Sequence, residues 1–209
     1  MIGKKCKICR RAGAKLLLKG ERCFSANCSF IKKPYAPGTK AGGRPKGLSE
    51  YGKQLKEKQK LRNIYGLREA QFSKYVKTVL GNRNKTENPA ALVVQVLEDR
   101  LDNVVFRLGF APSRTLSRQL VNHNHFTVNG KRVDIPSFKT KKGDIIAVKA
   151  SSVDTAYFKN ILTSLKKYKT PTWLKLDADK LEGEILGEAI MEEVALPVEI
   201  SSIFEYYSR

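Results

Sequence analysis

Basic side chains are concentrated at one end of this 209-residue chain, and their density restricts how that end can fold. Residues 1–85 hold 23 Lys and Arg against 4 Asp and Glu, whereas residues 151–209 hold 7 against 10. The chain carries a formal net charge of +20, most of it in its first two-fifths. Like charges at this density oppose compaction of an isolated domain. The pattern therefore predicts a polyanionic partner for the basic end and another contact for the acidic end.

Composition otherwise indicates a folded globular protein. The hydrophobic fraction is 41%, and the length suffices for one or two domains with a core. No stretch approaches the roughly 18 apolar residues that a membrane span needs. The first residues lack the apolar segment of a signal peptide. We therefore expect a cytoplasmic protein with no membrane contact and no small-molecule substrate.

Four cysteines near the start follow the pattern C-x2-C-x13-C-x4-C. Two thiolates separated by two residues can bind one ion, and a second pair completes a tetrahedral site. The loop between the pairs is too short and polar to bury a core, so a metal would supply the folding free energy. We predict one Zn²⁺, although an iron–sulfur cluster uses the same ligands and stays open. The predicted ligands are Cys6, Cys9, Cys23 and Cys28.

Periodicity and composition predict an α+β fold that is predominantly helical. We divide the chain into a four-cysteine metal module (1–33), a basic Pro- and Gly-rich extended linker (34–47), a basic helical domain (48–99), a compact α+β module of two helices and a small antiparallel sheet (100–150), and a mixed, acidic region that we expect to face protein (151–209).

Local signals place the individual elements. Ser49 is an expected N-cap for a helix to Ile64, and a shorter helix ends near Leu80. The apolar stripe after Asn88 predicts one long helix that continues to Gly109. The elements expected after it are a helix capped by Ser113 that runs to about residue 121, strands at 126–129, 131–135 and 145–149 around an Asn129-Gly130 hairpin, a helix at 154–167, strands at 172–176 and 181–186, and a helix at 200–207.

The helix after Ser49 is polar all round and has little to bury in its own domain. Only Glu50 and Glu57 offer internal ion pairs, so we expect phosphate contacts on more than one side. The cations on one face are Lys53, Lys56 and Lys60, and those near the opposite face are Lys58 and Arg62.

A second candidate surface lies on the helix capped by Ser113. Arg114, Arg118 and Asn122 are spaced to form a ridge opposite the apolar side of that helix. His123 follows directly, and we predict that it makes a polar RNA contact, with a structural role as the alternative. The chain shows no P-loop, dinucleotide-binding, zinc-protease or nucleophile-elbow motif, so an enzyme is not indicated.

Several segments together resemble one known family. They are residues 6–28, 48–60, 100–110, 118–123, 128–131, 171–174 and 206–209. In order and spacing, from end to end, they resemble bacterial small-subunit ribosomal protein four. The resemblance identifies 100–150 with the small RNA-binding domain named after this family, which also occurs in some pseudouridine synthases and tyrosyl-tRNA synthetases.

The resemblance implies a specific role. Members bind a five-helix junction in the 5′ domain of 16S rRNA early in small-subunit assembly and nucleate that assembly. They contact ribosomal protein five, at an interface linked to decoding accuracy, and line the mRNA entry channel with proteins three and five. Arg44 and Lys46 lie at positions matching the basic residues of that channel. The acidic region 151–209 resembles the part that meets protein five, with Trp173 and the aromatic residues of the last helix as expected anchors.

The predicted rRNA contacts combine the basic loop of the cysteine module with the two helices and the hairpin. They are Arg10, Arg11, Lys15, Arg22, Tyr51, Lys53, Gln54, Lys56, Lys58, Lys60, Arg62, Arg114, Arg118, Asn122, His123 and Lys131. The main alternative is an RNA-modifying enzyme that uses the same RNA-binding domain, which would need a catalytic domain within the last 59 residues. A zinc-finger transcription regulator would need a base-reading helix beside the cysteines, and none is indicated.

Overall fold

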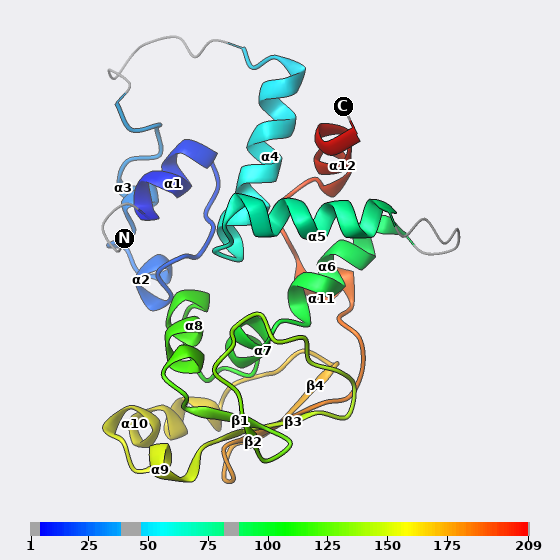
Figure 1. Ribbon diagram of the computed structural model, residues 1–209. Helices are drawn as coiled ribbons and strands as arrows, with labels where there is room; N and C mark the ends of the chain where they lie inside the picture. Colours follow the sequence, from blue (N-terminus) through cyan, green and yellow to red (C-terminus); the bar gives the residue numbers. More distant parts are fainter. Residues whose placement is uncertain (1–4, 39–46, 82–87, 209) are drawn as a thin grey trace. The chain divides into compact units, whose positions relative to one another are not determined.

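The computed structural model describes residues 5–38, 47–81 and 88–208, which form two compact units (Figure 1). Unit 1 comprises residues 1–93 and 195–209, and unit 2 comprises residues 94–194. The described chain is helix-rich with one antiparallel sheet, as the sequence predicts. No helix in the described ranges has the length and apolar character needed to cross a membrane.

Unit 1 is helical and is built around α4 and α5. Ser49 caps α4 as predicted, because its side chain accepts a hydrogen bond from the Gly52 N–H. Leu61, Phe72 and Val76 are fully buried between these helices and their neighbours. The helices of this unit are α1 (Lys5–Ala12), α2 (Glu21–Phe24), α3 (Ser29–Lys32), α4 (Glu50–Ile64), α5 (Glu69–Gly81), the start of α6 (Pro89–Glu98) and α12 (Ile200–Ser208).

One face of α4 is buried, so the expectation that this helix has little to bury in its own domain is wrong. Helix α12 packs along α4 and also contacts α5 (Figure 1). Gln54 and Lys58 are only 2% and 3% exposed there. The acidic partner of Lys58 and Arg62 is Glu69 at the start of α5, which lies outside the helix that carries them.

Unit 2 combines short helices with a five-stranded antiparallel sheet in the order β2-β1-β3-β5-β4. The predicted hairpin is confirmed: Asn129 and Gly130 have φ of 50° and 75°, and Val128 pairs with Lys131 across the turn. The elements are α7 (Leu101–Arg107), α8 (Arg114–Asn122), β1 (Phe126–Val128), β2 (Lys131–Arg132), β3 (Ile145–Val148), α9 (Ala150–Val153), α10 (Ala156–Leu165), β4 (Leu174–Asp177), β5 (Glu182–Ile185) and α11 (Met191–Val194).

The long helix expected from Asn88 to Gly109 is broken, and that prediction is wrong. Helix α6 ends at Glu98, Arg100 is extended and bridges Lys139, and α7 begins at Leu101. The Leu101 N–H donates to the Phe138 carbonyl at 2.9 Å. A distant loop thus supplies the acceptors that open a new helix, while the apolar stripe continues through both helices.

The boundaries of the units differ from those expected at 99/100 and 150/151. Strand β5 pairs with β3, so β4 and β5 extend the sheet of the 100–150 segment. Helix α12 belongs to unit 1 instead. The acidic C-terminal region is therefore shared between the two units. Of the expected linker, residues 39–46 lie outside the described residues, and Arg44 and Lys46 are among them.

Aromatic side chains fill the core of unit 2. Phe110, Phe126 and Phe158 are at most 1% exposed, with ring centroids of the first two 5.5 Å apart. Gly183 in β5 faces Leu108, and a Cβ at Gly183 would collide with that side chain. The close approach of sheet and helix therefore requires glycine at this position.

Candidate nucleic-acid interface

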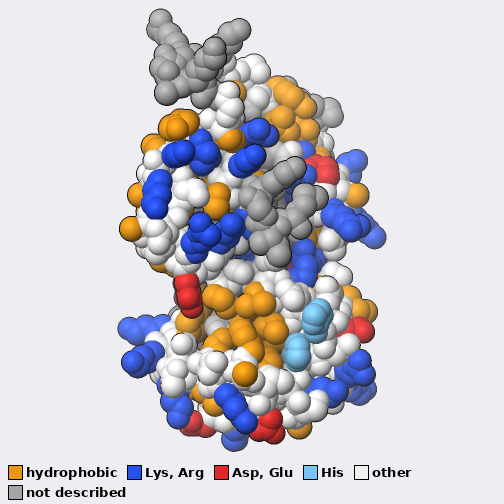
Figure 2. Space-filling view, turned by 90° about the vertical axis from the view of Figure 1, so that its left-hand side faces the viewer, with side chains coloured by type: hydrophobic (Ala, Val, Ile, Leu, Met, Phe, Trp, Pro, Cys, Tyr) orange, Lys and Arg blue, Asp and Glu red, His pale blue; other side chains and the backbone are white. Residues whose placement is uncertain are grey.

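A groove of about 580 Å³ lies between α1 and α4 in unit 1. Apolar side chains line part of it, and four cations reach it from both helices. These cations are Arg11, Lys56, Lys60 and Arg62. Figure 2 views the side of the molecule that carries α1–α3 and shows Lys and Arg side chains in several clusters over this unit. A basic groove with apolar walls suits a nucleic-acid backbone whose sugars and phosphates face the protein together.

Within the described chain, two of these cations lack a carboxylate in ion-pair contact. Lys60 pairs with Glu57 at 2.5 Å, and Arg62 pairs with Glu69 at 3.0 Å. Arg11 and Lys56 have no such carboxylate among the described residues. The Lys56 ammonium lies close to Gly13, which follows the last residue of α1 with φ of 66°. The positive field of the groove therefore comes chiefly from Arg11 and Lys56.

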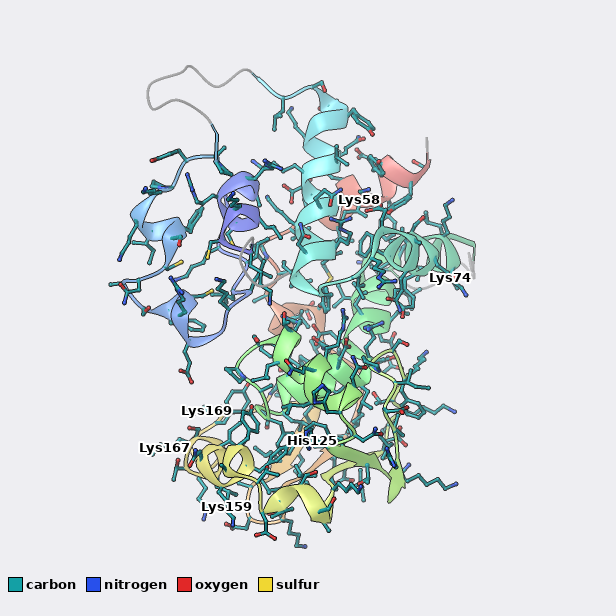
Figure 3. The ribbon with its side chains drawn as sticks, turned by 60° about the vertical axis from the view of Figure 1, so that its left-hand side comes forward. Lys58, Lys74, His125, Lys159, Lys167 and Lys169 are labelled. Atoms are coloured by element: carbon teal, nitrogen blue, oxygen red, sulfur yellow. The ribbon has the colours of Figure 1, made fainter. Side chains whose placement is uncertain are left out.

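The opposite face of α4 is used inside the unit. The Lys58 ammonium donates to Glu69 and lies 4.5 Å from the centre of the Tyr206 ring, between α4 and α12 (Figure 3). The Tyr207 hydroxyl donates to the same carboxylate at 3.0 Å. Partial burial would raise the pKa of Glu69, but the hydrogen bonds from Lys58 and Tyr207 and the nearby cations lower it overall.

Two further predicted rRNA contacts also meet α12. Gln54 donates to Glu205 at 2.8 Å, and the Tyr51 and Tyr206 hydroxyls lie 3.3 Å apart. Gln54 points inward, whereas Tyr51 stays about half exposed. Lys53 is exposed and pairs only with its neighbour Glu50. The structure thus separates the predicted contacts of α4 into an outward set and an inward set.

The structure brings the four cysteines together. All are free thiols and line one small cavity between α1, α2 and α3, where sulfur atoms appear in Figure 3. Burial raises the pKa of the Cys9 thiol, a backbone hydrogen bond from Leu16 lowers it, and the other three cysteines raise it further. The donor set suits zinc or an iron–sulfur cluster. Among the described side chains, however, no group of three or more His, Cys, Asp or Glu has an arrangement that would hold a metal ion. The metal site therefore stays a prediction.

The remaining basic residues of the cysteine module lie at its surface. Arg10 donates to the Tyr35 carbonyl at 2.9 Å and stacks over the Tyr35 ring. Lys15 lies 5.7 Å from the centre of the Phe24 ring. Arg22 is exposed beside a shallow hollow. Two of these basic side chains therefore lie over aromatic rings.

The two arginines of the ridge predicted on α8 are held by contacts within unit 2. Arg114 donates to Asn103 at 2.6 Å, and Arg118 pairs with the buried Asp102 at 2.7 Å. Asp102 also pairs with Arg100. The carboxylate of Asp102 comes from α7, so helix spacing within α8 alone did not reveal the contact. Other members of the predicted set in unit 2 are exposed: Asn122, His123 and Lys131.

The neighbouring histidine has a structural role. His125 lies 2.9 Å from the Ser152 hydroxyl and meets the Phe158 ring edge-on. Burial, followed by the charges of His123 and Lys149, lowers its pKa. His125 is therefore held within the fold, whereas His123 remains at the surface.

Sequence reasoning missed two exposed cations of α5. Lys74 and Lys77 lie on the side of α5 away from the buried Val76 and Val79, and Lys74 is marked in Figure 3. Their spacing of three, interleaved with buried valines, was the available signal. They widen the basic surface of unit 1 beyond α4.

Comparison with known proteins shows the family. Residues 1–98 match the family described as Ribosomal protein S4/S9 N-terminal domain, and residues 99–146 match the S4 domain. The small ribosomal subunit protein uS4 of Heliobacterium modesticaldum is 47% identical over 208 residues, which cover 99% of this chain and 98% of that one. This chain belongs to the ribosomal protein uS4 family. Two further uS4 proteins are similar. That of Ruminiclostridium cellulolyticum is 48% identical over 98% of this chain and 96% of its own length. That of Thermotoga maritima is 44% identical over 99% of this chain and 98% of its own length.

Family membership decides between the functional alternatives. The relatives are structural ribosomal proteins and not enzymes, so an RNA-modifying enzyme is not favoured. Both family matches lie in the parts that carry the predicted rRNA contacts. The basic groove of unit 1 therefore belongs to a protein type that assembles with RNA.

Proposed function

We propose that this chain is a structural constituent of the small ribosomal subunit and that unit 1 binds rRNA through the groove between α1 and α4. The observation that carries the proposal is the meeting of Arg11 and Lys56 in that groove, in a member of the uS4 family. Its net charge of +20 supports a large polyanionic partner.

Binding in this groove is electrostatic and geometric. Lys and Arg side chains replace counterions condensed along the phosphates, which supplies most of the affinity. Helices α1 and α4 fix the spacing of the cations. A-form RNA hides its base edges in a deep major groove, so a fixed spacing selects shape more than sequence.

The proposed target is the five-helix junction in the 5′ domain of 16S rRNA, which the chain binds early to nucleate assembly. Support comes from the resemblance of the segments quoted above to ribosomal protein four. The same resemblance supports a place at the mRNA entry channel, with Arg44 and Lys46 as the basic residues there and ribosomal proteins three and five as neighbours.

The proposed contact with ribosomal protein five, and with it the effect on translational accuracy, involves an acidic surface of unit 2. Leu186, Ile190 and Met191 are exposed, and acidic residues surround them in sequence: Glu188, Glu192 and Glu193. Trp173 is not an anchor, because it is buried in the fold. The tyrosines of α12 are likewise not free anchors, since they pack on α4 and α5.

We also propose that Cys6, Cys9, Cys23 and Cys28 bind one Zn²⁺, with an iron–sulfur cluster as the alternative. The support is the gathering of four thiols around one cavity in a module with few apolar residues. A bound metal would cross-link α1 to the segment that carries α2 and α3.

The groove is tested by filter binding of a 16S 5′-domain fragment over a range of salt concentrations. Arg11→Ala and Lys56→Ala should each weaken binding and lower the salt slope by about one unit. The matched control is Lys180→Ala, which removes an exposed lysine of unit 2. Groove variants that bind with the affinity and slope of the control would refute the proposal.

A further inference from the structure

The ring of Tyr168, in the loop between α10 and β4, lies face-on over the backbone of Gly109. A Cβ at Gly109 would lie 2.8 Å from Cδ1, 2.9 Å from Cγ and 3.0 Å from Cε1 of that ring. These consecutive ring atoms are nearly equidistant, which an edge-on approach would not give. One face of the ring is therefore covered, yet 43% of Tyr168 is exposed. The exposed part of the residue therefore lies away from the face that covers Gly109.

Gly109 is required for this contact for two reasons. Its φ of 85° ends α7 in the left-handed region that favours glycine. Any side chain at this position would also displace the tyrosine ring. The Tyr157 hydroxyl donates to the Phe110 carbonyl at 2.8 Å, and the Tyr168 N–H donates to the Leu165 carbonyl at 3.0 Å. The start of α10 is thus fixed near the turn at Gly109, and the backbone of Tyr168 is fixed to the end of α10.

Positive charge surrounds the tyrosine. The charges of Arg107 and Arg114 act on the Tyr168 hydroxyl, although burial has the larger effect and raises its pKa. Lys167 and Lys169 precede and follow it, and both project into solvent (Figure 3). In the described residues, no carboxylate lies in ion-pair contact with either lysine. The acidic C-terminal region thus contains a local basic segment centred on an exposed aromatic ring.

This combination has a chemical use in RNA binding. An aromatic face with cations on both sides suits an unpaired nucleobase, because the base stacks on the ring while flanking phosphates meet the lysines. A tyrosine that only covered the end of α7 would account for the covered face. It would not account for the 43% exposure of the residue or for the cations beside it.

We propose that Tyr168 is a stacking platform for one unpaired rRNA base, with Lys167 and Lys169 binding the adjacent phosphates. The proposal rests on the proposed rRNA-binding function and adds a contact in unit 2 that is separate from the groove in unit 1. It also assigns part of the acidic C-terminal region to RNA, a region that the sequence had assigned to protein.

The test compares Tyr168→Leu with Tyr168→Phe. Both keep an apolar side chain over Gly109, but only Phe keeps an aromatic face. Binding is measured to the 16S 5′-domain fragment and to a fully paired RNA duplex of equal length. Tyr168→Leu should bind the fragment about tenfold more weakly and the duplex as well as wild type. Tyr168→Phe should match wild type on both. Ile145→Ala, at 46% exposure and without neighbouring cations in sequence, is the control and should change neither.

A second measurement uses the unmodified protein. Ultraviolet cross-linking to the 5′-domain fragment, followed by mass spectrometry, should place a nucleotide adduct on Tyr168. If Tyr168→Leu binds the fragment like wild type and no adduct forms, the platform is refuted. If Arg11→Ala and Lys56→Ala still weaken binding, the proposed rRNA-binding function stands although the platform fails. Failure of the platform is therefore distinguishable from failure of the rRNA-binding function.

Discussion

Lys58 and Glu69 form an ion pair between α4 and the start of α5, with only 4% of the Lys58 side chain exposed. The described helix with the most Lys and Arg residues thus commits one of its lysines to folding. The same carboxylate also holds Arg62 and the Tyr207 hydroxyl. Glu69 therefore joins three helices, and the cations around it serve stability before they serve RNA.

Lys58 and Lys53 should separate stability from binding. Lys58→Ala leaves a half-exposed carboxylate without its buried partner and should lower the free energy of unfolding by about 1–3 kcal/mol. Lys53→Ala removes an exposed pair and should change stability by less than about 0.5 kcal/mol. Urea unfolding measures both. At a temperature where both variants are folded, we expect Lys53→Ala to lose more rRNA affinity than Lys58→Ala. Equal stability of the two variants would contradict a stabilising role for the buried Lys58–Glu69 pair.

Asp99 should make the protein less stable as pH rises. Burial raises its pKa to about 6, against an ordinary value of 3.8, despite the opposing charge of Lys139. The folded state then binds the proton more tightly than the unfolded state, so stability falls between about pH 4 and pH 6. Asp99→Asn should be more stable than wild type by about 2 kcal/mol at pH 7 and equally stable below about pH 4. If the difference in unfolding free energy between Asp99→Asn and wild type is the same at every pH, Asp99 does not cause the pH dependence.

The four cysteines should hold one metal ion. Elemental analysis of purified protein should give about one zinc per chain, or several irons if a cluster forms. Cys9→Ser should lose most of the metal, and a strong chelator should loosen the α1–α3 module, as seen by faster proteolysis there. Full metal content in Cys9→Ser would remove the support for a four-cysteine site.

Arg118 should matter first to the fold of unit 2. Arg118→Ala leaves the buried Asp102 with one arginine fewer, and we expect a loss of about 1–3 kcal/mol in unfolding experiments. Asn122→Ala, one turn further along α8 and exposed, should be close to neutral. If Arg118→Ala unfolds like wild type but loses rRNA affinity, its ion pair with Asp102 contributes little and the arginine acts mainly on RNA.

The parts of the fold that the sequence predicted are those set by neighbouring residues. Ser49 and Ser113 cap their helices, and Asn129-Gly130 turns its hairpin, because each interaction spans three or four positions. The break at Arg100 was missed because its cause is a loop near Pro136 and Phe138. The apolar stripe continues across the break, so periodicity alone could not show it.

The candidate site shows the same limit. Helical spacing correctly placed Lys58 opposite Lys56, but Arg62, which was expected beside Lys58, lines the groove together with Lys56. It could not show which face meets α12, since Gln54 and its partner Glu205 are 151 positions apart. For the cysteines, spacing predicted a gathering that the structure contains, because all four thiols lie within 23 residues of one another. Tyr168 escaped notice because its meaning depends on Gly109, 59 positions earlier in the chain.

Unit 1 joins the first 93 residues to the last 15, and this arrangement sets an order for folding during synthesis. A nascent chain emerges from its N-terminus, so residues 94–194 are complete before α12 appears. Until then the inner face of α4 lacks the cover of α12, and Lys58 has no tyrosine rings above it. The second unit along the chain is therefore the first that can finish folding. An RNA that reached the unfinished protein would meet a wider basic helix than the one the mature protein presents.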